Sequence, residues 1–70
     1  MEQEDQQNMS EDELVVSVIE FVKQERRASI SAIQRKFWIG YNRAAQIMER
    51  LEGLRVVSKP DRQGQRTVLI

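Results

Sequence analysis

The chain has 70 residues, with eleven basic and eleven acidic side chains, no cysteine and no histidine. This length allows one small domain with a modest core, and the missing residue types exclude disulfides, thiolate metal sites and histidine-based catalysis. No apolar run approaches the roughly 18 residues that cross a bilayer, so we expect a cytoplasmic module without membrane contact, metal or cofactor.

The zero net charge hides a strong asymmetry along the chain. Residues 1–13 hold six acids and no base, whereas the other 57 residues hold all eleven bases against five acids, a net charge of +6. A basic body of this kind is typical of nucleic-acid binding, and simple solubility is the alternative interpretation.

The N-terminal segment, residues 1–10, is polar, acidic and rich in glutamine, which predicts a disordered leader before a folded domain over 11–70. Ser10 and Glu13 fit a capping box. They predict a first helix over about 11–26, with an apolar stripe that faces the core.

Two shorter helices are expected next. Ser31 is the predicted N-cap of a second helix that ends at about Phe37, and Ile39 and Gly40 form a turn. The third helix then continues to about Glu52. One side of it has core spacing, and the other carries polar side chains that can hydrogen-bond to base edges in a major groove.

The pattern changes period after the third helix. Val56 and Val57 open a β-type run, residues 60–65 have turn chemistry, and residues 66–70 close as a second strand. The expected fold is therefore α+β and mostly α: a winged helix-turn-helix with three helices and a C-terminal β-hairpin wing. Arg55 stands where winged helices usually have a glycine, so we expect Gly53 to end the third helix instead.

Residues 28–52, ASISAIQRKFWIGYNRAAQIMERLE, closely resemble the C-terminal gamma domain of the FtsK/SpoIIIE family of bacterial DNA translocases. The family pattern reads approximately ASIS-x-VQR-x-F-x-IGYNRAARIIE-x-ME. The resemblance implies a domain that reads polarised, G-rich chromosomal motifs in double-stranded DNA. It also implies that the domain orients a translocase on them and activates a XerD-type recombinase during chromosome segregation at cell division.

The resemblance further implies a parent motor domain outside this chain, in a protein anchored in the inner membrane. The chain contains no G-x-x-x-x-G-K-[ST] phosphate loop, so we expect it not to be an enzyme. The alternative function is a protein-interaction winged helix with reduced or altered DNA specificity, such as a stand-alone gamma-like regulator.

The residues expected to read bases lie at the start and middle of the third helix. Asn42 and Arg43 match the family's base-reading pair, and Glu49 matches as well. Gln46 replaces the family's second arginine, and glutamine lacks the charge that favours guanine and phosphate. Helix-face solvation or pairing is the alternative for Arg43, Gln46 and Glu49.

A second group is expected at the DNA backbone, where contacts fix register without reading sequence. It comprises residues of the second helix, the start of the third helix and the wing: Ser29, Ser31, Gln34, Arg35, Tyr41, Arg62 and Arg66. Trp38 stands where the family usually has lysine or arginine. It is expected either to contact a protein partner or to pack over the corner between the second and third helices.

Overall fold

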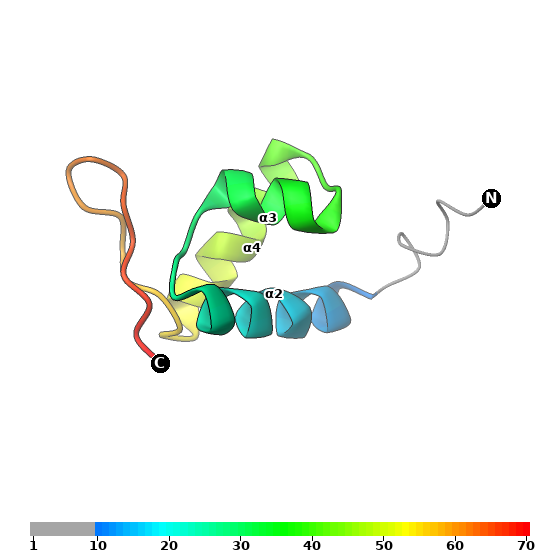
Figure 1. Ribbon diagram of the computed structural model, residues 1–70, viewed down its shortest axis with the longest axis horizontal. Coiled ribbons are helices and arrows are strands. Elements are labelled where there is room, and N and C mark those ends of the chain that lie inside the picture. The colour runs from blue at the N-terminus through cyan, green and yellow to red at the C-terminus, as the bar shows by residue number, and fades with distance from the viewer. Residues whose placement is uncertain (1–9) are drawn as a thin grey trace.

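The computed structural model describes residues 10–70, so the predicted disordered leader lies outside the described residues except for Ser10. The described part contains three helices: α2 (Glu11–Glu25), α3 (Ile30–Phe37) and α4 (Tyr41–Gly53). The helix α3 lies above α2, and α4 packs against both (Figure 1). Within residues 10–70, no helix has the length and hydropathy of a membrane span.

The start of α2 confirms the predicted capping box. Ser10 Oγ accepts the N–H of Glu13 at 3.1 Å, and Glu13 Oε1 accepts the N–H of Ser10 at 3.0 Å. The helix ends at Glu25, where Arg26 turns the backbone into the left-handed region and donates its N–H to the Val22 carbonyl at 2.8 Å. The predicted span is therefore correct to within one residue.

The predicted N-cap of the second helix is wrong, because α3 begins earlier. Ser29, with extended backbone, is the cap, and its Oγ accepts the N–H of Ala32 at 3.2 Å. Ser31 lies inside the helix instead. The earlier start makes Ile30 the first helical residue, which lets its side chain pack against the core.

The helix α4 ends where the prediction places its end, but the left-handed cap is not Gly53. Gly53 is the last helical residue, and the left-handed residue is Arg55, with φ of 65°. The Val56 N–H reaches the Leu51 carbonyl at 2.9 Å, and the Arg55 N–H reaches the Glu52 carbonyl at 3.0 Å. This is a Schellman motif. Leu51 and Val56 are both buried, so apolar packing fixes the end of the helix and overrides the preference for glycine.

The core is assembled from the inner faces of the three helices and the start of the C-terminal segment. Phe21 of α2 and Phe37 of α3 meet edge to face with ring centroids 5.7 Å apart, and the Lys36 ammonium lies 5.9 Å from the Phe21 ring. Within residues 10–70, the buried side chains are Leu14, Val15, Val18, Val22, Ile33, Ala44, Ile47, Met48, Leu51, Val56 and Val57.

The β-hairpin wing predicted for the C-terminal segment, residues 56–70, is not confirmed. No strand is present in residues 10–70, but Val57 and Val68 form an isolated antiparallel bridge, and Ala28 forms another with Arg66. Beside the first bridge, the Ser58 N–H donates to the Thr67 carbonyl at 2.9 Å and the Leu69 N–H donates to the Val56 carbonyl at 2.8 Å. The chain runs out into a loop and returns beside α2 (Figure 1). The Thr67 N–H donates to Ser58 Oγ at 2.8 Å instead of to a ladder carbonyl, and Pro60 has no N–H to extend a ladder.

Candidate nucleic-acid interface

The outward face of α4 carries three of the four predicted base-reading residues. Asn42, Gln46 and Glu49 are all exposed. At 3.6 residues per turn, these positions fall within an arc of about 60°. The buried residues of α4 lie on the opposite side of the helix. Three side chains with amide or carboxylate groups are therefore presented along one line, supported from behind by the core.

Arg43, the fourth predicted reader, lies elsewhere on the helix. It is about 100° around the axis from Asn42, on the flank that faces α2. Its Nη2 atom lies 3.5 Å from Oε1 of Glu11, and both side chains are close to half exposed, at 40% and 46%. The contact is a single, long hydrogen bond, which leaves other guanidinium donors without a partner at Glu11.

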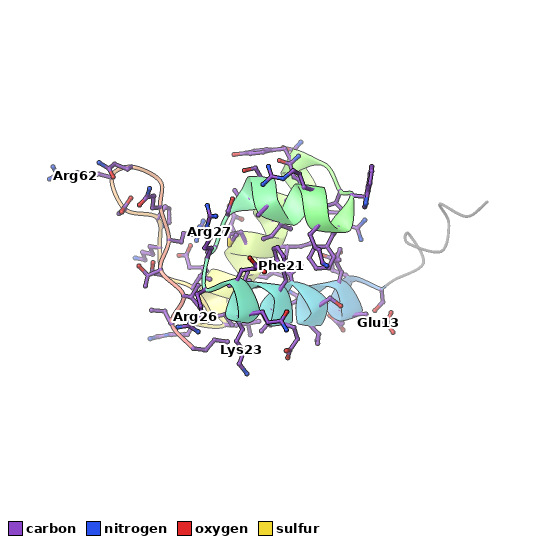
Figure 2. The ribbon with its side chains drawn as sticks, in the orientation of Figure 1. Glu13, Phe21, Lys23, Arg26, Arg27 and Arg62 are labelled. Carbon is purple, nitrogen blue, oxygen red and sulfur yellow. The ribbon has the colours of Figure 1, made fainter. Side chains whose placement is uncertain are left out.

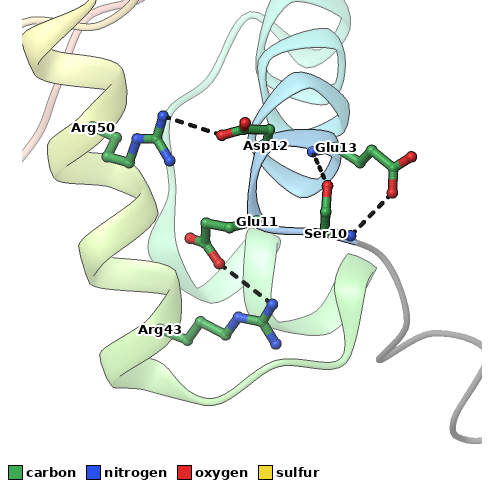
Figure 3. A network of polar contacts seen from close by, with 6 residues as sticks. All are labelled: Ser10, Glu11, Asp12, Glu13, Arg43 and Arg50. Atoms are coloured by element: carbon green, nitrogen blue, oxygen red, sulfur yellow. Dashed lines mark hydrogen bonds and ion pairs between the residues drawn. The ribbon is translucent and has the colours of Figure 1, made fainter.

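A second ion pair joins the same two helices one step along the flank. Arg50 Nη2 lies 3.6 Å from Asp12 Oδ1, so the first turn of α2 faces both arginines of α4 (Figure 3). Sequence reasoning missed these pairs because the acids have a local explanation, the helix dipole. The only available signal was the seven-residue spacing of Arg43 and Arg50, which places them on one flank.

The opposite flank of α4 is linked to the C-terminal segment through Arg66. Its Nη1 donates to Glu52 Oε1 at 2.7 Å and to the Ser58 carbonyl at 3.2 Å. The Arg66 side chain is only 12% exposed. Arg66, which was predicted to contact the DNA backbone, therefore already donates to two acceptors within the domain. These hydrogen bonds link the start of the loop to α4.

The predicted backbone contacts of α3 fall into two groups. Ser31 and Arg35 are exposed, whereas Gln34 is half-buried. Ser29 is half-buried and its hydroxyl caps α3, with Ser31 Oγ 3.4 Å away. Tyr41 is exposed at the first position of α4. Ser31, Arg35 and Tyr41 therefore have exposed side chains that a ligand can contact.

The loop of the C-terminal segment is folded around one carboxylate. Asp61 Oδ1 accepts the N–H groups of Gln63 and Gln65, both at 2.8 Å. Gly64 has φ of 83°, a conformation that suits glycine. Arg62 is exposed at the outer end of this turn and projects away from the helices (Figure 2). The sequence predicted a turn here but not the role of Asp61.

Trp38 is the most exposed large apolar residue of the described part, with 82% of its surface accessible. It ends α3 in the left-handed conformation, with φ of 57°. This exposure does not fit the alternative of packing over the corner between α3 and α4, and contact with a protein partner stays a prediction. Together with Tyr41 it forms the aromatic corner, defined as these two side chains at the α3–α4 junction. In residues 10–70 no cluster of acidic side chains could hold a metal ion.

Comparison with known proteins places this chain among translocase domains. Residues 9–70 match the model of a family described as the FtsK gamma domain. The DNA translocase FtsK of Vibrio vulnificus is 53% identical over 58 residues, which cover 83% of this chain and 6% of that protein. The DNA translocase FtsK of Shewanella oneidensis is 52% identical over 58 residues, again 83% and 6%.

A more distant relative is DNA translocase FtsK 1 of Neisseria meningitidis serogroup B. It is 45% identical over 62 residues, which cover 89% of this chain and 8% of that protein. The chain thus spans less than a tenth of the length of the translocases to which it is similar.

Proposed function

The chain belongs to the FtsK gamma domain family, and from this premise we propose that it binds double-stranded DNA by inserting α4 into the major groove. The observation that carries the proposal is the outward line of Asn42, Gln46 and Glu49. These side chains are exposed, share one face and are held by a buried opposite face. A helix so arranged fits the width of a B-DNA major groove.

Each side chain on this line has a matching base edge. The amides of Asn42 and Gln46 suit adenine N6 and N7, and the Glu49 carboxylate suits the N4 amino group of cytosine. Each good bidentate pair contributes about 1–3 kcal/mol of discrimination. Arg43 remains in the proposal as a contact at the edge of the groove, directed to guanine or to phosphate.

Backbone contacts would come from the surfaces beside α4. We assign them to Ser29, Ser31, Gln34 and Arg35 of the α3 region, with Tyr41 and the loop-tip residue Arg62. Arg66 acts in this scheme by holding the loop in place through Glu52. Such contacts release counterions, so the affinity should fall steeply as salt is raised.

The cellular role that we propose follows from the relatives. In a parent translocase, this domain would orient the motor on polarised, G-rich chromosomal motifs and activate a XerD-type recombinase. ATP hydrolysis and the inner-membrane anchor would belong to other parts of that protein, and this domain would act in the cytoplasm. The names of the relatives support a parent DNA translocase, and the small share of their length that is matched is consistent with a motor outside the matched residues.

The proposal is tested by selecting binding sites for this chain from random duplex DNA. We expect an enriched motif for the natural chain, no enrichment for Asn42→Ala, and an unchanged motif for Gln24→Ala, an exposed change on α2. Gln46→Arg should change the preferred base at one position toward guanine. If the natural chain enriches no motif, it does not read DNA sequence.

A second candidate function, docking of a protein partner, is favoured by the aromatic corner. Trp38 and Tyr41 are 82% and 60% exposed, and exposed aromatic residues are common at the centres of protein interfaces. Titration calorimetry against a XerD-type recombinase, with the natural chain and Trp38→Ala, would test it. Recombinase binding that Trp38→Ala abolishes, without binding to any duplex, would favour this function over DNA reading.

A further inference from the structure

We propose that Glu11 and Asp12 limit the sequence-independent affinity of this domain for DNA by withholding the two arginines of α4 from phosphate. This inference rests on the proposed function, because it concerns how strongly α4 is attracted to a duplex. It assigns the first turn of α2 a role in binding in addition to its role in starting the helix.

The geometry brings two acids and two arginines together across the α2–α4 interface. The pairs are Glu11 with Arg43 at 3.5 Å and Asp12 with Arg50 at 3.6 Å (Figure 3). The capping box of Ser10 and Glu13 fixes the start of α2 and so determines where these acids lie. Arg43 and Arg50 are the only cations within α4, so both positive charges of the helix have an acidic partner.

Both paired arginines lie on the flank of α4 that faces α2, beside the outward face. Asn42 and Gln46 of the outward face carry no charge, and Glu49 makes no ion pair within residues 10–70. To contact a DNA phosphate, Arg43 or Arg50 must break its ion pair with Glu11 or Asp12. The carboxylate that loses its partner then lies near the negatively charged DNA backbone. Because the ion pairs are long and exposed, breaking one costs little free energy, and contact with a DNA phosphate can compensate for this cost.

The test measures binding of a labelled random duplex across a range of salt concentrations, with Glu11→Gln and Asp12→Asn. Each change should strengthen binding about two- to fivefold, the factor expected for the loss of one exposed ion pair. The slope of log affinity against log salt should become steeper by up to about 0.9 for each arginine released to a phosphate.

Two comparisons separate this mechanism from a general effect of net charge. Glu20→Gln removes one acid from α2, but Glu20 has no ion pair in the described part of the chain, so we expect a smaller gain. In an Arg43→Ala background, Glu11→Gln should have no more effect than Glu20→Gln. Equal gains from Glu11→Gln with and without Arg43, or no gain at all, would overturn the inference.

The outcomes also distinguish this inference from the proposed function. If the natural chain binds no duplex even at low salt, DNA binding itself is wrong and the inference fails with it. If the chain binds and selects a motif but Glu11 and Arg43 show no coupling, only the inference fails. We expect α2 to keep its structure in both variants, because Glu11→Gln and Asp12→Asn preserve side-chain size. Circular dichroism of each variant checks this.

Discussion

Arg62 and Arg66 lie four residues apart in the same loop region, yet their surroundings are opposite. Arg62 is exposed at the tip, whereas the Arg66 side chain is 12% exposed and donates to both Glu52 and Ser58. Sequence alone gives both the same expected role. The structure divides the roles: one arginine has its charge available to a ligand, and the other holds the loop against α4.

Arg66→Ala should therefore reduce the free energy of unfolding by about 1–3 kcal/mol, because it leaves Glu52 without its charged hydrogen-bond partner. Urea denaturation followed by circular dichroism measures this change. The matched variant Arg62→Ala should alter stability by less than about 0.5 kcal/mol, while it weakens binding to all DNA sequences alike. Equal stability losses in the two variants would contradict this division.

Each helix of residues 10–70 is followed, within two residues of its end, by a non-glycine residue in the left-handed conformation: Arg26, Trp38 and Arg55. Side chains with a Cβ adopt this conformation at a cost of about 1 kcal/mol or more. At α4 the conformation is imposed by the Schellman motif, whose apolar residues Leu51 and Val56 are buried. Packing at the element's end thus outweighs a local preference of the backbone.

Arg55→Gly should stabilise the domain by up to about 1 kcal/mol, because glycine has no Cβ to strain at positive φ. Arg55→Ala is the matched control. It removes the same guanidinium but keeps the Cβ, so we expect no stabilisation. Thermal denaturation of the three proteins checks the prediction. If alanine and glycine stabilise equally, the guanidinium, not the backbone, is the source of the effect.

At the scale of the whole molecule, two long-range contacts join the C-terminal segment to the connection between α2 and α3. Arg26 donates to the Ile70 carbonyl at 2.7 Å, and Ala28 bridges Arg66. The core itself is small, and a domain of this size is stabilised by about 3–9 kcal/mol. Loss of a single well-packed side chain should therefore remove a large part of the free energy of unfolding.

Ile47→Ala should lower the free energy of unfolding by about 2–5 kcal/mol, since Ile47 is fully buried on the inner face of α4. The melting temperature should drop by more than about 10 °C in a domain of this length. Val16→Ala, which shortens an exposed residue of α2, should change it by only a few degrees. A similar drop for both variants would mean that the core is not where the structure places it.

The parts that sequence predicted well have local or periodic causes. The capping box of α2, the inner face of α4 and the outward line of Asn42, Gln46 and Glu49 all follow from residue type and helical spacing. The predictions were wrong where contacts between residues far apart in the sequence determine the local structure. Ser29 and Ser31 are equally good caps by composition, and the packing of Ile30 decides between them.

Contacts between distant residues also explain why the sequence did not predict the structure of the C-terminal segment or the pairing of Arg43 and Arg50. The β-type pattern pairs Val57 with Val68, but side-chain hydrogen bonds then take up the Ser58 carbonyl and the Thr67 N–H, so the pairing does not continue as a ladder. No spacing rule links Glu11 to Arg43 across 32 positions, because that pairing depends on how α2 crosses α4.

Trp38, the only tryptophan of the chain, lies outside the core and is 82% exposed. Its emission in the native domain should therefore resemble that of an indole in water, and unfolding should change it little. A ligand that covers the corner between α3 and α4 should instead shift the emission to shorter wavelength. The fluorescence of Trp38 therefore reports little on folding, and it responds instead to a ligand that binds at the corner between α3 and α4.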